Sequence, residues 1–258
     1  MDFTPSPEQQ AVADVVTSVL ERENTWDALV SGGVVALAVP DRLGGDGLGL
    51  PEAATALTEI GRRGTTGPAL ATIGLALVPL VDLATEAQQD RYLAGVASGA
   101  VLSAALNEAG NQLPEKPSTS YAGGKLNGTK IGVPYAETAQ WLLVTTDSGV
   151  VVVSPTAAGV TVEKTPTANG SDEYVVTFTD VAVADDDVLA GATVARVNEL
   201  ALAMIGAFGA GLVAGALRLT ADYTATREQF GRPLSTFQTV AAQLSEVYIA
   251  SRTIDLVS

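Results

Sequence analysis

The stretch Leu200–Leu217 reads LALAMIGAFGAGLVAGAL, eighteen residues without a charge. That length is close to the minimum for a helix that crosses a membrane. The stretch is rich in Ala and Gly rather than in Leu and Ile, and it continues into Arg218 and Asp222. Gly211 and Gly215 form a G-x-x-x-G pattern, which lets two helices approach closely. We therefore favour a fully buried helix of a soluble protein over a membrane span.

The residue types that are missing limit the possible chemistry. The chain of 258 residues has no cysteine, which excludes disulfides, and no histidine, which removes histidine-based triads and most zinc sites. Its net charge is −15 with scattered basic residues, so nucleic-acid binding is disfavoured. The N-terminal MDFTPSPEQQ is acidic and polar, unlike a signal peptide, so we expect a cytoplasmic protein. The Asn-x-Thr and Asn-x-Ser patterns at Asn127 and Asn169 are therefore interpreted as turns.

The first hundred residues have helical periodicity. Ser6 as N-cap, Pro7 at the first helical position and Gln9 closing a capping box predict the start of the first helix. Further helices are predicted at Trp26–Leu37, Leu50–Arg62, Pro68–Leu83 and Glu86–Ser98. The sequence therefore predicts an N-terminal helical domain at residues 1–101.

From Leu102 the pattern changes to short β-branched runs between turn signals. Strands are predicted at Leu142–Thr146, Val150–Ser154, Tyr174–Phe178 and Val181–Val183. Gly123-Gly124 and Asn127-Gly128 are hairpin-type dipeptides, and Asp147-Ser148-Gly149 separates two of the strands. These signals predict a small antiparallel β domain at residues 102–190.

The pattern is helical again from Arg196. One long helix is predicted to run to about Thr226, and a second to begin near Ser235, after a Gly-Arg-Pro turn. The second helix has a stripe suited to a bundle, formed by Val240, Leu244, Val247, Ser251 and Ile254. Residues 191–258 are thus predicted to begin a C-terminal helical bundle. The fold class is α+β, with the order α, β, α.

Four segments resemble the acyl-CoA dehydrogenase family, flavoproteins that desaturate an acyl-CoA between its α and β carbons. They are ALAVPDRLGGDGLGL (Ala36–Leu50), LNGTK (Leu126–Lys130), FTDVAVADDDVL (Phe178–Leu189) and TREQFGRPLSTFQ (Thr226–Gln238). The last is the most specific. It gathers two arginines, two aromatic residues and two glutamines in a chain that is poor in charge and aromatics. The resemblance covers essentially the whole chain and implies the family's three-domain fold.

The resemblance implies that TREQFGRPLSTFQ contacts a cofactor. In the family, the arginine of R-x-x-F-G reaches across a subunit interface to a neighbour's FAD, and here that residue is Arg227. Its planar, permanently charged guanidinium suits a pyrophosphate. Gln229 and Gln238 can hydrogen-bond to the cofactor, and Phe230 can supply an apolar wall. The alternative is an ordinary helix–turn–helix whose arginine caps a helix end.

Two turn residues complete the interpretation of this segment. Gly231 is expected to permit a sharp helix end, and Pro233 to stop the first helix from continuing. Arg232 falls on the turn, and we expect it to be solvated rather than functional.

The family's own-subunit flavin signatures are degenerate. One resembles T-E-P-x-A-G-S-D; here the segment is NEAGNQLPE (Asn107–Glu115), and only Glu108 fits. The other is W-I-T, and the corresponding residues are Gly132, Val133 and Pro134. Proline has neither a side-chain donor nor a backbone N–H. We interpret these changes as loss of the chain's own flavin site; the alternative is a member that binds FAD through other contacts.

No catalytic base is identified. In one branch of the family the glutamate base lies 26 residues before the interface arginine, which is Ala201 here. Glu199 is two helical residues away and is turned by roughly 200°. In the other branch the base lies in the last helices, beyond Ser258. Gly45–Gly49 is interpreted as a loop rather than a dinucleotide fingerprint, and Asp185–Asp187 as a solvated turn rather than a metal site.

The leading hypothesis is a subunit of a heteromeric acyl-CoA dehydrogenase that shares FAD with a second family subunit. The narrower resemblance is to actinobacterial enzymes that act on steroid side-chain CoA thioesters and contain two copies each of two different subunits. It implies a bulky acyl-CoA substrate and a heterotetramer. Two alternatives remain open: a self-sufficient dehydrogenase with a divergent flavin site, and a non-enzymatic scaffold on the same fold.

Overall fold

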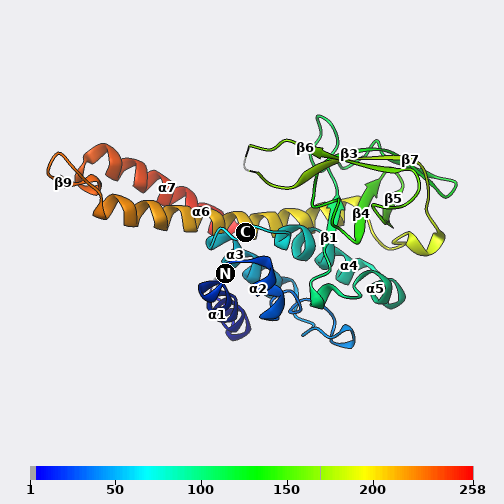
Figure 1. The fold of residues 1–258 in the computed structure, drawn as a ribbon, viewed down its shortest axis with the longest axis horizontal. Coiled ribbons are helices and arrows are strands. Elements are labelled where there is room, and N and C mark those ends of the chain that lie inside the picture. Colours follow the sequence, from blue (N-terminus) through cyan, green and yellow to red (C-terminus); the bar gives the residue numbers. More distant parts are fainter. Residues whose placement is uncertain (1–3, 169, 258) are drawn as a thin grey trace.

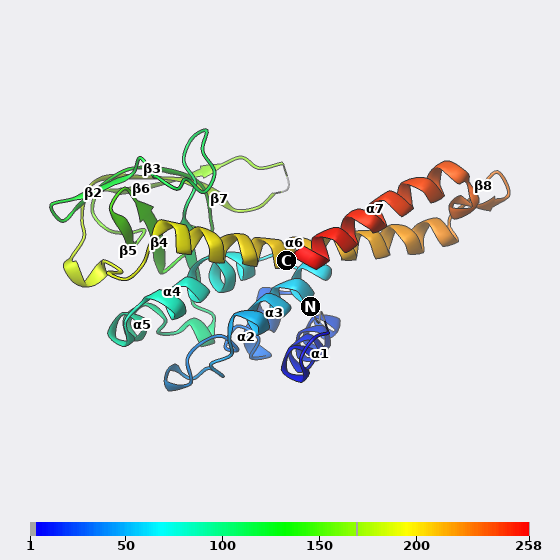
Figure 2. The same ribbon diagram turned by 180° about the vertical axis from the view of Figure 1, so that it is seen from behind.

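The computed structural model describes residues 4–168 and 170–257, and it describes no side chain beyond Ile254. Asn169, the second of the Asn-x-Ser/Thr positions, lies outside the described residues. Figures 1 and 2 show helices α1 to α5 on one side of a long helix, α6, with most of the strands gathered at one end of α6 and a helical hairpin projecting at its other end.

The N-terminal segment is helical, as the sequence predicts. Ser6 Oγ accepts a hydrogen bond from Gln9 N (3.2 Å) and Gln9 Oε1 accepts one from Ser6 N (2.8 Å), so the predicted capping box is present. The helices and helical turns are α1 (Pro7–Arg22), α2 (Trp26–Ser31), η1 (Asp41–Leu43), α3 (Leu50–Arg62), η2 (Leu70–Leu77), α4 (Val78–Leu83), α5 (Glu86–Tyr92) and η3 (Val96–Ser98).

Two of these helices are shorter than predicted. Helix α2 ends at Ser31, because Gly32 and Gly33 follow and Gly33 has a positive φ of 76°. Helix α5 ends at Tyr92, before Gly95, whose φ is 81°. The predicted helix at Pro68–Leu83 is present, but η2 is a π-helix that continues directly into α4.

The seven strands of the middle segment form two sheets. The elements are β1 (Leu102–Ala105), β2 (Ser120–Ala122), β3 (Lys125–Pro134), β4 (Trp141–Thr146), β5 (Gly149–Val153), β6 (Val160–Thr165) and β7 (Glu173–Ala182). One sheet has the order β1-β4-β5 and the other β2-β3-β7-β6. The antiparallel prediction holds except at β1, which pairs parallel to β4. The predicted strands Tyr174–Phe178 and Val181–Val183 are one strand, β7, which ends at Ala182.

The hairpin signals are confirmed in two of three cases. Gly123 and Gly124, with φ of 58° and 73°, connect β2 to β3. Asp147 and Ser148 connect β4 to β5. Asn127-Gly128 does not form a turn: it lies inside β3, at a shift of register against β7. That prediction was wrong because an Asn-Gly pair also fits a β-bulge, where one residue has a positive φ; here Gly128 has φ 143°.

The sheet β1-β4-β5 is covered on both faces, which explains its nearly continuous apolar sequence. Alternate residues point to opposite faces. Leu143 of β4 and Val152 of β5 belong to the core shared with the helices, whereas Val144 and Val151 belong to the core between the two sheets. The sheet β1-β4-β5 therefore lies between the core that it shares with the helices and the core that it shares with the second sheet.

Helix α6 (Val194–Thr226) is buried along one face only, so the prediction of full burial was wrong. Leu200, Met204 and Ala207 are buried, whereas Leu202 is 57% exposed. Helix α6 is long and apolar enough to cross a membrane by length and composition, yet its buried face packs along α3 and η2 in the core.

The predicted close approach of helices at Gly211 and Gly215 is present. A Cβ on Gly211 would overlap the carbonyl oxygen of Thr58 in α3, and a Cβ on Gly215 that of Arg62. Gly61 of α3 faces Phe208 of α6 in the same way. The backbones of α3 and α6 are therefore in contact, which only glycine permits at these positions.

This contact predicts a stability effect. Gly211→Ala should lower the free energy of unfolding by about 1–3 kcal/mol, because the added methyl group has no space against α3. Gly209→Ala on the same helix is the matched control, since no atom lies within 4 Å of its added Cβ. It should be neutral or stabilise by up to about 1 kcal/mol. Urea unfolding of the two variants measures the difference; equal stabilities would contradict the close approach.

Candidate functional site

The segment that follows α6 is a small β-hairpin. Helix α6 ends at Thr226, and the extended Arg227 donates its N–H to Tyr223 O (2.8 Å). Strands β8 (Glu228–Gln229) and β9 (Arg232–Pro233) pair through a tight turn. Leu234 N then donates to Arg227 O (2.8 Å), and η5 (Leu234–Thr236) leads into α7 (Gln238–Val257). We call Arg227–Gln238 the cofactor hairpin.

Gly231 has a different role from the predicted one. It does not end the helix, which stops at Thr226. With Phe230 it forms the two-residue turn of the cofactor hairpin, with φ of 53° at Phe230 and 76° at Gly231. Such turns require positive φ at both central residues, which explains glycine there. Helix α7 begins at Gln238 rather than near Ser235, because η5 intervenes.

The four predicted cofactor contacts lie together in the cofactor hairpin, and all are exposed. Within the described residues, the Arg227 guanidinium has no hydrogen bond or ion pair. Gln229 Nε2 donates to Glu228 O (2.8 Å). The Phe230 side chain is 94% exposed, and Gln238 is the first residue of α7. The hairpin lies at the end of the molecule farthest from this chain's sheets (Figures 1 and 2). Its role in cofactor binding stays a prediction.

Arg232 is exposed but is held by an aromatic ring. Its guanidinium carbon lies 4.1 Å from the centroid of Phe237. Its exposure agrees with the expected solvation, and the cation also stacks on the ring. The stripe predicted on α7 is only partly covered: Ser251 is buried, Leu244 is half-buried and Val247 is exposed.

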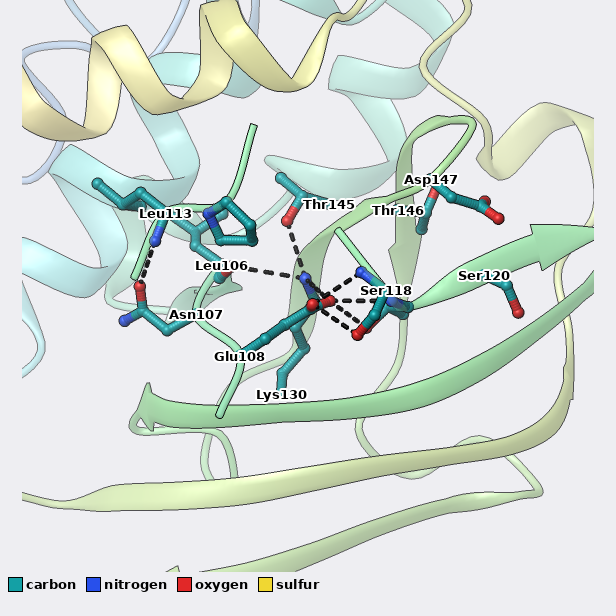
Figure 3. Close-up of polar contacts among 12 residues, drawn as sticks. Leu106, Asn107, Glu108, Leu113, Ser118, Ser120, Lys130, Thr145, Thr146 and Asp147 are labelled. Carbon is teal, nitrogen blue, oxygen red and sulfur yellow. Dashed lines mark hydrogen bonds and ion pairs between the residues drawn. The ribbon is translucent and has the colours of Figure 1, made fainter. Parts of the chain in front are cut away.

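The degenerate segment after β1 is anchored by a buried ion pair. Lys130 Nζ lies 3.0 Å from Glu108 Oε1 and donates to Thr145 Oγ1 (3.1 Å), as Figure 3 shows. The Glu108 carboxylate also accepts hydrogen bonds from N and Oγ of Ser118 (2.7 Å each) and from N and Oγ1 of Thr119 (2.9 and 2.8 Å). Every acceptor of Glu108 faces the protein, so this carboxylate is not available to a ligand.

Burial and hydrogen bonding act in opposite directions on this pair. Burial alone would raise the pKa of Glu108, but the four hydrogen bonds from Ser118 and Thr119 outweigh it and hold the pKa well below the usual carboxyl range. Burial lowers the pKa of Lys130, and the pairing with Glu108 opposes that shift. Sequence reasoning missed the role of Lys130. The sequence did contain a signal. Lys130 lies four residues after the apolar Leu126 in the same strand, so the two side chains are expected on the same, buried face of the sheet.

The tip of the same segment is held against α6. Asn107 Oδ1 accepts a hydrogen bond from Leu113 N (3.0 Å). Asn198 Nδ2 in α6 donates to Leu113 O (3.0 Å) and to Pro114 O (3.3 Å), and Leu113 packs against the helical core. Leu113 and Pro114 are therefore held against α6 by hydrogen bonds within the chain.

The second degenerate segment lies beside the first. Ile131 N donates to Asn107 O (3.0 Å), so the two segments that sequence analysis singled out are neighbours. Gly132 has a φ of 57°, at an irregularity of β3 between Lys130 and Val133. A large side chain is strained at that φ. A tryptophan at this position would therefore be strained in the backbone conformation of this chain.

The position of the family's base is a buried apolar residue. Ala201 lies in the core of α6 with none of its surface exposed. Glu199 points outward and lies 3.5 Å from Arg196, as the helical angle predicted. Among the described residues no carboxylate replaces Ala201 on the buried face of α6.

Comparison with known proteins identifies the family. Residues 6–100 match the N-terminal domain of acyl-CoA dehydrogenases, and residues 194–257 match their C-terminal domain. Acyl-CoA dehydrogenase FadE28 of Mycobacterium tuberculosis is 69% identical over 258 residues, which are 100% of this chain and 76% of FadE28. The chain belongs to the acyl-CoA dehydrogenase family. FadE27 of the same organism is 31% identical over 96% of this chain and 68% of FadE27.

Solved structures of the family have the same fold. The ChsE4-ChsE5 complex from Mycobacterium tuberculosis superposes with a TM-score of 0.88 at 27% identity, over 99% of this chain and 77% of that chain. A variant of the Tcur3481-Tcur3483 steroid ACAD gives a TM-score of 0.82 at 29% identity, over 95% and 74% of the two chains. Helix α6 is thus the core helix of an acyl-CoA dehydrogenase fold.

Acyl-CoA dehydrogenases bind FAD, and the two candidate sites of this member differ in their fit. At Asn107–Pro114 and Gly132–Pro134 the residues do not fit a flavin, because the tip is bonded to α6, Gly132 has a left-handed backbone and Pro134 has no N–H. In the cofactor hairpin, Arg227 has no partner among the described residues and offers a planar cation of the kind that suits a diphosphate.

The weaker candidates are structural. Asp187 accepts a hydrogen bond from Tyr92 OH (2.6 Å) and pairs with Arg91 (2.6 Å), so the acidic run at Asp185–Asp187 (η4) is tied to α5. The described residues contain no group of acidic side chains placed to hold a metal ion. Gly45 is packed against backbone carbonyls of Ala36 and Val39, as expected for a tight loop.

Proposed function

We propose that this chain is one subunit of a heteromeric, FAD-dependent acyl-CoA dehydrogenase. In this proposal Arg227, Gln229, Phe230 and Gln238 contact the FAD held mainly by a second family subunit. The single observation that carries the proposal is the contrast between the two halves of a family flavin site. In the segment that would reach a neighbour's FAD, Arg227 is exposed and has no partner among the described residues. The segments that would line the chain's own flavin site are instead hydrogen-bonded to other parts of this chain.

The proposed roles of this chain and of its partner subunit follow from the side chains that this chain has at each position. Bound FAD would accept the hydride that leaves the β carbon of the acyl-CoA. This chain supplies a cation for the diphosphate at Arg227 and an apolar surface at Phe230. Ala201 cannot take the α proton, and no described residue of this chain is assigned the role of catalytic base. The second subunit is a partner from the same family, as the heteromeric ChsE4-ChsE5 relative supports.

The finer assignments belong to the same proposal. We assign a bulky, steroid side-chain acyl-CoA as the substrate, supported by the likeness to a steroid ACAD. The assembly is a cytoplasmic heterotetramer with two copies of each subunit, without nucleic-acid or membrane partners. The chain is divided into domains at residues 1–101, 102–190 and 191–258.

The experiment is a measurement of flavin content. The chain is purified alone and after co-expression with a family member encoded beside it, and bound FAD is quantified from its visible absorbance. We expect no flavin in the chain alone and about one FAD for each pair of unlike subunits in the complex. One FAD per subunit in the chain alone would instead support a self-sufficient dehydrogenase. A complex without flavin would support a scaffold.

A further inference from the structure

Phe237 joins two parts of the cofactor hairpin. Its backbone N donates to Leu234 O (3.0 Å), which closes η5. Its carbonyl oxygen accepts a hydrogen bond from Ala241 N (2.9 Å), which is the first bond of α7. Phe237 therefore links η5 to α7 and lies directly before Gln238, the first residue of that helix.

The ring of Phe237 also contacts the other side of the hairpin. The Arg232 guanidinium carbon lies 4.1 Å from the centroid of the ring. The ring of Phe230 meets it edge to face, with 6.2 Å between centroids and 72° between planes. Both geometries are favourable for cation–π and aromatic pairs. The hairpin tip and the start of α7 are thus connected through one side chain.

The tip needs this support. Phe230 has a φ of 53°, an unfavourable conformation for a residue with a large side chain. Strands β8 and β9 contain only two residues each, and such a short hairpin is not stable by itself in water. Strained conformations of this kind persist only where the surroundings fix them. In the described structure, the ring contacts with Phe230 and Arg232 supply that constraint.

We propose that Phe237 is a positioning residue of the cofactor hairpin. Its ring holds Phe230 and Arg232 in place and its backbone places Gln238 at the start of α7, so that the hairpin presents a preformed surface to the partner's FAD. Phe237 itself is not assigned a contact with the cofactor. This inference rests on the proposed function, because it concerns the same shared site.

The test compares Phe237→Leu with Phe237→Trp in the complex of this chain with its family partner. Phe237→Leu should weaken FAD binding about tenfold, because it removes both ring contacts. Phe237→Trp keeps an aromatic face and should rescue binding to within about threefold of the wild type. Tyr223→Leu is the matched control: this aromatic is exposed near the hairpin, forms no ring contact with any described side chain, and should leave FAD affinity unchanged.

A double-mutant cycle with Arg232→Gln separates positioning from simple loss of stability. If Arg232 is held through the ring, its substitution should weaken FAD binding in the wild type but not in Phe237→Leu. Additive effects, or equal losses in Phe237→Leu and Phe237→Trp, would overturn the inference. Arg227→Ala is measured in parallel. If it abolishes FAD binding while Phe237→Leu leaves the affinity unchanged, only the role of Phe237 is wrong; if Arg227→Ala has no effect, the proposed function and this inference are both wrong.

Discussion

Arg227→Ala is expected to remove FAD from the heteromeric complex without separating its subunits. A charge-assisted hydrogen bond to a diphosphate contributes about 1.5–3 kcal/mol, so FAD affinity should fall by about 10- to 100-fold or more. The chain itself should remain stable, because the Arg227 side chain bonds to no described residue. Gel filtration followed by FAD titration measures both outcomes.

Two variants control this result. Arg218→Ala removes an arginine from α6, the helix that precedes Arg227; its side chain is 80% exposed and 3.9 Å from Asp222, and the variant should leave FAD bound. Arg227→Lys keeps the charge but not the planar fork, so its affinity should be intermediate. Retained FAD and normal turnover in Arg227→Ala would contradict the shared-site proposal.

Lys130→Met is expected to destabilise the fold by about 3–5 kcal/mol, because it leaves the Glu108 carboxylate buried without its counter-charge. The effect should appear in urea unfolding as a lower midpoint. Lys130 is fully buried and its pairing with Glu108 joins the segment after β1 to β3. We therefore expect the loss to affect the β domain first.

The controls use a surface pair and a double variant. Lys164→Met breaks the exposed pair between Lys164 and Asp172, and should change stability by at most about 1 kcal/mol. Glu108→Gln combined with Lys130→Met removes both charges and should recover part of the loss. If Lys130→Met is as mild as Lys164→Met, the buried pair does not hold the segment.

Local rules in the sequence accounted for most of the elements. The capping box at Ser6 and Gln9, the helix at Leu50–Arg62 and the turn at Gly123-Gly124 depend only on residues close in the chain, and all three are present. The glycines at 211 and 215 correctly indicated close helix packing. Family likeness, carried mainly by TREQFGRPLSTFQ, indicated the acyl-CoA dehydrogenase fold, which the relatives confirm.

Other features depend on partners far apart in the chain, and sequence reasoning missed them. Parallel pairing of β1 with β4 is set by how the sheet fits between two cores, not by either strand alone. Burial of one face of α6 depends on where α3 and η2 lie. The role of Lys130 requires Glu108 from another segment, which is close only once the β domain has folded.

For the candidate site, the sequence by itself determined which groups are available: a cation at Arg227, an aromatic at Phe230, and no base at Ala201. Their chemistry is a property of single residues. Tertiary structure decided what each group can reach. It turned Glu108 inward to Lys130, bonded the tip at Leu113 to Asn198, and left Arg227 exposed at the end of a long helix. Exposure and pairing depend on the folding of distant segments around one another, which no local pattern encodes.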